Sequence, residues 1–168
     1  MFAKIRFALV TALLLIGSTF AAVALTPAEI QRKWAAQSTL TGTFITQYEG
    51  GNQSHGDFHM QGPLQLVMEY RATGGQLIFN ASGIAMVDVN YPANNTMRRD
   101  SRLKAIFSTQ PSFAGYHSSK GSNAEHTVLG FAADEGAMKV YFSNRSGRLS
   151  YLVIFGSDGK STTQFFYD

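Results

Sequence analysis

From Gly42 to the end of the chain, polar and apolar residues alternate through a series of short runs. A period of two places successive side chains on opposite faces of a strand. Turn segments such as EGGNQ, TGG, ASG, NRSG and SDG separate the runs, and Asp158-Gly159 between two apolar runs is a strong hairpin signal. The pattern predicts a single antiparallel sheet of about nine strands. This sheet limits the possible folds more than any other feature of the sequence.

A helix is predicted ahead of the sheet. Thr26 is a suitable N-cap, Pro27 suits the first helical position, and Glu29 can reach back to the free backbone N–H groups. The helix is expected to run to about Gln37 and to pack through a side that carries Trp34.

A second, shorter helix is predicted within the segment DSRLKAIFST. Leu103, Ile106 and Phe107 recur at i, i+3 and i+4, and Asp100 or Ser101 can cap the first turn. The Gly- and Ser-rich stretch that follows, TQPSFAGYHSSKGSNAE, is typical of a long loop. Two short helices are too few to cover a flat sheet of this size, so the sheet is expected to curl.

The predicted fold class is therefore mainly β, in an α+β arrangement. A strongly curved antiparallel sheet would form an incomplete barrel, with an N-terminal helix and a short lid helix over a hydrophobic cavity. One face of the run PLQLVMEY presents four apolar residues, namely Leu64, Leu66, Met68 and Tyr70. That row would be either ordinary core or a wall of the cavity.

The first 24 residues predict a secretory signal peptide. Lys4 and Arg6 precede an apolar run, and Ala22 and Ala24 form an A-x-A cleavage pattern. The run is shorter than the roughly 20 residues of a membrane span. Residues 25–168 would then form one exported domain, free of a lipid anchor because the chain has no cysteine to acylate.

Composition argues against several function classes. The formal net charge is +3, and two of the positive charges lie in the predicted leader, so the remaining chain is close to neutral and gives no electrostatic case for nucleic acid. His55 and His59 would lie about 13 Å apart along a strand, too far to share a metal ion. No nucleophile elbow or paired-carboxylate motif is present. No enzyme activity, metal or cofactor is predicted.

Several short segments, taken in order, resemble one known family. They are FITQY followed by a hairpin, the pattern G-x-F-x-x-x-x-P that begins at Gly56, an alternating strand ending in E-Y, then ASG, SRLKAIF and finally FGSDGKSTT. Together they cover nearly all of residues 25–168 and resemble the periplasmic outer-membrane lipoprotein carrier family, LolA. The chain is similar to a divergent member.

This resemblance implies a half-open barrel whose interior takes up the acyl chains of lipoproteins. It places Leu66, Met68, Phe79 and Met86 in the lining. The other candidate lining residues are Leu64 and Tyr70, from the same apolar row as Leu66 and Met68, and Leu77 on the next predicted strand. The resemblance also assigns Leu103, Ile106 and Phe107 to the lid.

The implied function is ferrying acylated lipoproteins across the periplasm, as a monomer. The implied partners are an inner-membrane ATP-driven release complex and an outer-membrane lipoprotein receptor.

One departure from the family concerns the lid. Family members carry an Arg that latches the lid closed just before the proline of the third strand, where this chain has Gly62. Arg71 or Arg102 could replace that donor.

Two other functions stay open: a carrier of another lipid or glycolipid, and a scaffold or sensor with the same fold that carries no lipid.

Overall fold

The computed structural model describes residues 25–118, 122–133, 136–156 and 158–168. The predicted signal peptide, residues 1–24, lies outside this part of the chain. The described residues form one α-helix, two short 3-10 helices and ten strands. The helices are α1 (Pro27–Ala35), η1 (Pro92–Asn94) and η2 (Ser101–Ala105). The strands are β1 (Leu40–Tyr48), β2 (Gln53–Gln61), β3 (Gln65–Tyr70), β4 (Gln76–Asn80), β5 (Gly83–Val87), β6 (Thr96–Arg99), β7 (His126–Ala133), β8 (Gly136–Ser143), β9 (Leu149–Phe155) and β10 (Ser161–Tyr167).

All ten described strands belong to one antiparallel sheet, in the order β6-β5-β4-β3-β2-β1-β10-β9-β8-β7. The chain builds one arm of the sheet outward from β1 to β6 and returns to build the other arm from β7 to β10. The first and last strands therefore pair in the middle, with Thr43 opposite Tyr167 and Tyr48 opposite Thr162.

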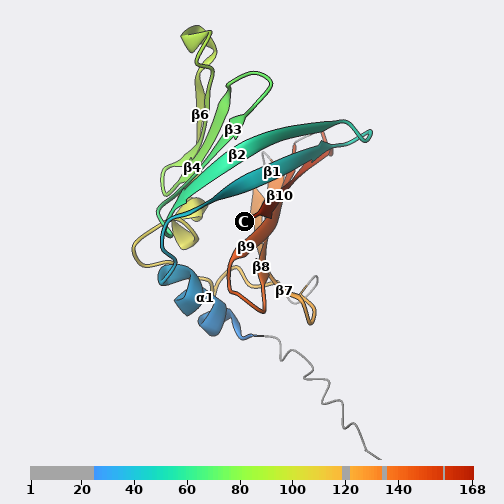
Figure 1. Ribbon diagram of the computed structural model, residues 1–168. Coiled ribbons are helices and arrows are strands. Elements are labelled where there is room, and N and C mark those ends of the chain that lie inside the picture. Colours follow the sequence, from blue (N-terminus) through green and yellow to red (C-terminus); the bar gives the residue numbers. More distant parts are fainter. Residues whose placement is uncertain (1–24, 119–121, 134–135, 157) are drawn as a thin grey trace, which may run out of the picture.

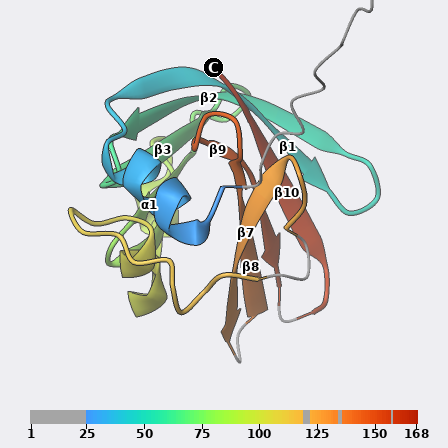
Figure 2. The same cartoon turned by 90° about the horizontal axis from the view of Figure 1, so that it is seen from below.

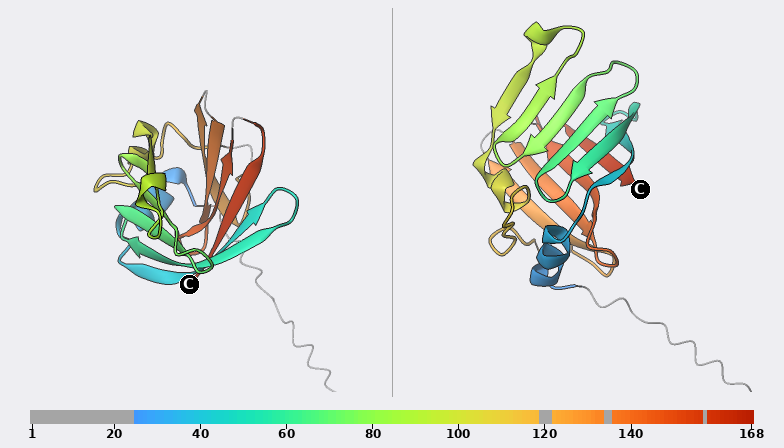
Figure 3. Two further views of the ribbon diagram at one scale, coloured as in Figure 1. Left: turned by 90° about the horizontal axis from the view of Figure 1, so that it is seen from above. Right: turned by 60° about the vertical axis from the view of Figure 1, so that its left-hand side comes forward.

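The sheet is strongly curved, so its two arms face each other across a concave interior (Figure 1). Seen from above, the two arms curve around the concave interior (Figure 3). The β6 and β7 edges are not paired with each other in the sheet order of the described strands. The architecture is thus the predicted incomplete barrel with a helix.

The helix α1 lies across one end of the concave interior, as the view from below shows (Figure 2). Its N-terminus has the predicted capping box: the Glu29 backbone N–H donates to Thr26 Oγ1 at 3.3 Å, and the Thr26 backbone N–H donates to Glu29 Oε2 at 2.8 Å. Ile30 and Trp34 are its two buried residues. The helix ends at Ala35, two residues earlier than predicted.

Three details differ from the sequence-based prediction. The strand β6 was not predicted, because TMRR has too few apolar residues to show alternation. The segment expected to be a short α-helix is the 3-10 helix η2, with Ile106 as its C-cap. Leu64 does not lie on a strand: it follows a turn at Gly62, whose φ is +53°, and β3 begins only at Gln65.

Candidate functional site

The inward-facing residues of each strand change in character along the barrel. On β1, Phe44 packs in the core, Thr46 is buried, and Tyr48 is partly exposed at the far end. On β3, Met68 is fully buried, while Tyr70 borders an open cavity. The interior therefore has a packed half near α1 and a hollow half at the opposite end.

Most residues expected to line the cavity or to form the lid belong to the packed half. Six of them are at most 3% exposed and lie in the hydrophobic core: Leu66, Met68, Phe79, Leu103, Ile106 and Phe107. They form this core with Trp34, whose ring meets that of Phe107 edge-on at a centroid distance of 6.2 Å. None of the six is among the described residues that border the cavity.

The hollow half contains a half-open cavity of about 590 Å³. This volume lies within the range of about 300–1,000 Å³ typical of small-molecule sites. Residues of β1 to β6 and of the turns between them form one side, and residues of β9 and β10 form the other. The cavity is lined by Thr46, Tyr48, Ser54, His55, Tyr70, Ala72, Thr73, Gly75, Gln76, Leu77, Ile84, Met86, Val87, Asp88, Thr96, Arg98, Ile154, Thr162 and Gln164.

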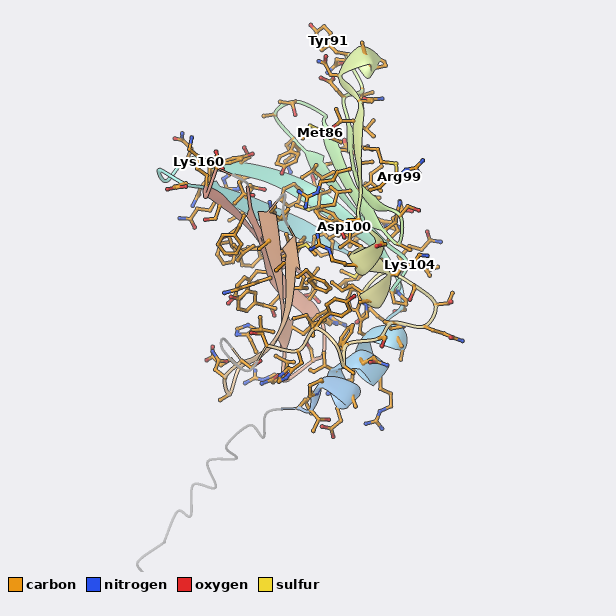
Figure 4. The ribbon with its side chains drawn as sticks, turned by 180° about the vertical axis from the view of Figure 1, so that it is seen from behind. Met86, Tyr91, Arg99, Asp100, Lys104 and Lys160 are labelled. Carbon is orange, nitrogen blue, oxygen red and sulfur yellow. The ribbon has the colours of Figure 1, made fainter. Side chains whose placement is uncertain are left out.

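Three of the predicted lining residues do border this cavity, namely Tyr70, Leu77 and Met86. Met86 is 53% exposed, and the hairpin that carries it extends beyond the cavity to Tyr91 at its tip (Figure 4). Leu64 is 42% exposed and is not among the cavity-lining residues of the described chain. Further apolar lining residues come from β5 and β9, namely Ile84, Val87 and Ile154, and most of the other lining residues are polar.

The seam between β1 and β10 gives the cavity a polar part that the sequence analysis did not identify. Thr46 and Gln164 are directly opposite each other in the register, and they are only 1% and 2% exposed. The Thr46 hydroxyl lies 3.2 Å from the Tyr70 hydroxyl, and burial raises the pKa of Tyr70 above its usual value. Tyr70 therefore remains a neutral hydrogen-bonding group at ordinary pH. Polar residues at inward positions of TGTFITQY and STTQFFY were the available sequence signal.

The cavity wall also carries a cationic group, Arg98 on β6. Its nearest described acidic partner is Asp100, with the Arg98 Nη2 atom 3.9 Å from Asp100 Oδ2. That carboxylate is held by a second arginine, since Arg102 Nε donates to Asp100 Oδ1 at 2.8 Å. The hydrogen bond from Arg102 holds the pKa of Asp100 below its usual value.

The two arginines considered as replacements for the family latch behave differently. Arg102 donates to Asp100 and to the main-chain carbonyl of Ala132, and thereby ties η2 to β7. Arg71 Nε instead donates to Asp57 on β2 at 2.8 Å in an exposed ion pair. Of the two, Arg102 is the one that restrains the segment expected to form the lid.

No group of three or more His, Cys, Asp or Glu residues suited to a metal ion occurs in the described part of the chain. Within the same residues, no helix has both the length and the apolar character needed to span a membrane.

No protein-family model and no curated protein matches the chain. Solved structures do resemble it. A LolA superfamily protein from Nitrosomonas europaea is 9% identical, with a TM-score of 0.42, over 86% of this chain and 93% of that one. A putative outer-membrane lipoprotein-sorting protein domain from Vibrio parahaemolyticus is 12% identical, with a TM-score of 0.44, over 84% and 88%.

The chain is also similar to MucB in the MucA/MucB complex of Pseudomonas aeruginosa, at 9% identity and a TM-score of 0.40. That match covers 83% of this chain and 55% of the other. The structures to which the chain is similar thus include members of the superfamily that its sequence resembles. At these identities and scores the likenesses assign no function.

Proposed function

We propose that this protein is an exported carrier that shelters the acyl chain of a lipid-modified protein in the cavity between the two arms of the sheet. In the cell it would work in the periplasm after removal of residues 1–24. It would take an acylated lipoprotein from an ATP-driven release complex in the inner membrane and deliver it to a receptor at the outer membrane. This role requires binding and release but no catalysis.

The observation that carries the proposal is the half-open cavity of about 590 Å³, whose lining surface is provided mainly by apolar atoms. An apolar cavity of about 150 Å³ is enough to take up a benzene molecule. The cavity described here can therefore hold a hydrocarbon several times that size. Leu77, Ile84 and Ile154 offer partly buried apolar surface for such a chain.

Burial of a chain in this cavity would be favourable by about 0.8 kcal/mol per CH₂ group that leaves water. A carrier must also release its ligand, so a fully enclosed, deep pocket would hold an acyl chain too tightly. The cavity is half-open, and the other half of the interior is already filled by Phe79, Phe107 and their neighbours. Both features limit the buried length of the chain and so limit the affinity.

A direct test uses the mature protein purified from the periplasm and a fluorescent dansyl-labelled undecanoic acid. We expect saturable binding and displacement of the probe by unlabelled fatty acid. Leu77→Glu would place a charge in the cavity wall and should weaken binding at least tenfold, because the carboxylate must be desolvated when a hydrocarbon covers it.

Ile78→Glu is the matched control. Ile78 is the next residue on β4, is also half-buried, and pairs with Val67 on the opposite face of the sheet. This variant should bind the probe as the wild type does. Absence of probe binding by the wild type, or equal binding by Leu77→Glu, would refute the proposal.

Native mass spectrometry of the protein from the periplasm identifies its natural ligand. A co-purifying acylated protein supports the carrier role. A co-purifying free lipid or glycolipid would show that the cargo is that lipid and not a lipoprotein.

A further inference from the structure

The side-chain amide of Gln164 is a buried polar group of the cavity lining, and the protein does not complete its hydrogen bonds. Its Nε2 atom is 3.5 Å from Thr162 Oγ1, at the outer limit of a hydrogen bond. Its Oε1 atom is buried and has no hydrogen-bond partner among the described residues. Gln164 is 2% exposed and belongs to the cavity lining, so its incompletely bonded amide lies in the wall that a bound chain would contact.

The neighbouring polar groups do not complete the arrangement. Thr46 is directly across the β1–β10 seam, but its hydroxyl interacts with the Tyr70 hydroxyl at 3.2 Å. The hydroxyls of Thr46, Tyr70 and Thr162 and the amide of Gln164 therefore lie together in the lining of this cavity. A buried acceptor without a donor is costly, and natural proteins rarely keep one without a reason.

A plain hydrocarbon chain fits this arrangement poorly. It would pack CH₂ groups against the Gln164 amide and leave the acceptor unpaired. A chain that carries an O–H or N–H group at the right depth would supply the missing donor. A hydroxyl suits the site best, because it can donate to Gln164 and also accept from a neighbouring hydroxyl.

We infer that the preferred ligand is a hydroxylated acyl chain, whose hydroxyl group donates a hydrogen bond to Gln164 Oε1 at the β1–β10 seam. This inference rests on the proposed function, because it assumes that an acyl chain enters the cavity. It adds a selection rule to that function: the protein discriminates among chains by a polar group part-way along them.

The test is a competition series against the dansyl-labelled probe, with dodecanoic acid and a set of monohydroxydodecanoic acids that differ in hydroxyl position. At least one hydroxylated acid should bind the wild type about tenfold more tightly than dodecanoic acid, as expected for pairing one buried acceptor. The preferred position reports how deeply the chain enters.

Gln164→Met replaces the amide by an apolar side chain of similar length. This variant should lose the preference, so that the hydroxylated acids and dodecanoic acid bind within about twofold of each other, as expected when no polar group distinguishes them. Gln61→Met, at an exposed position of β2 outside the cavity lining, should keep the full preference.

The outcomes separate this inference from the proposed function. If dodecanoic acid binds but no hydroxylated acid binds more tightly, the inference is wrong and the carrier function stands. If none of the acids displaces the probe, both are wrong. The wild-type series decides the question even where Gln164→Met fails to fold.

Discussion

The indole Nε1 of Trp34 donates a hydrogen bond of 2.8 Å to the main-chain carbonyl of Ile106, and both residues are buried. This bond joins α1 to the segment that follows η2, although the two lie far apart in the sequence. It fixes the apolar residues of that segment in the packed half of the interior.

Replacement of Trp34 by Phe should lower the free energy of unfolding by about 1–3 kcal/mol, because the Ile106 carbonyl loses its buried donor. The aromatic contacts with Phe107 and Phe142 can persist in part. Urea titration followed by circular dichroism measures the change. Arg32→Ala, on the exposed side of the same helix, should change stability by less than about 0.5 kcal/mol. Equal stability of Trp34→Phe and the wild type would show that the bond is not maintained in solution.

Shortening an apolar side chain should cost more in the packed half than in the hollow half. Leu66→Ala should destabilise the protein by about 2–5 kcal/mol, since Leu66 is fully buried and its loss leaves a void. Leu77→Ala, beside the existing cavity, should cost only about 1 kcal/mol, because less packing is lost at a half-buried position. The midpoints of urea unfolding of the two variants test this difference, and the reverse order would contradict the division of the interior.

The Asp100–Arg102 contact should make stability depend on pH in the acid range. The pKa of Asp100 is lowered in the folded protein, so its stabilising contribution is complete above the unfolded value of about 3.9 and is lost as the pH falls through the lower folded value. Asp100→Asn should therefore be less stable than the wild type by about 1–2 kcal/mol at pH 7. The gap should narrow progressively below pH of about 4. A gap that is constant from pH 7 to pH 3 would show that the charge is not involved.

Gly56 should tolerate no side chain. A Cβ atom there would lie 2.1 Å from the Glu69 carbonyl oxygen and 2.3 Å from the ring of Phe44, which packs over the glycine from the paired position on β1. Gly56→Ala should destabilise the protein by about 1–3 kcal/mol through overpacking. Gly115→Ala is the control, since nothing lies within 4 Å of the added atom. Thermal unfolding of the two variants provides the comparison, and equal melting temperatures would contradict this prediction.

Local patterns were enough to predict much of the fold. The capping box at Thr26 and Glu29 predicted α1, and alternation predicted nine of the ten described strands. The curled sheet followed from the shortage of helices to cover it. These features depend on neighbouring residues or on overall composition, which a single sequence displays directly.

The location of the cavity could not be predicted in the same way. Alternation identifies the inward-facing residues of β3 and β4, but it does not show where along a strand α1 and η2 fill the interior. Leu66 and Phe79 are therefore core, whereas Tyr70 and Leu77 border the cavity. Gln164 was missed because its importance depends on tertiary placement at the β1–β10 seam. Leu64 was expected to line the cavity because the predicted strand included it. In the structure β3 begins at Gln65, so the predicted strand boundary was wrong.

The pairing of β1 with β10 also completes the cavity, because residues of both strands line it. Contacts between the two ends of a long segment form slowly, because the chain must first close a large loop. Thr46 and Gln164 come from opposite sides of that loop. A chain in which β1 and β10 have not yet paired therefore has no complete pocket.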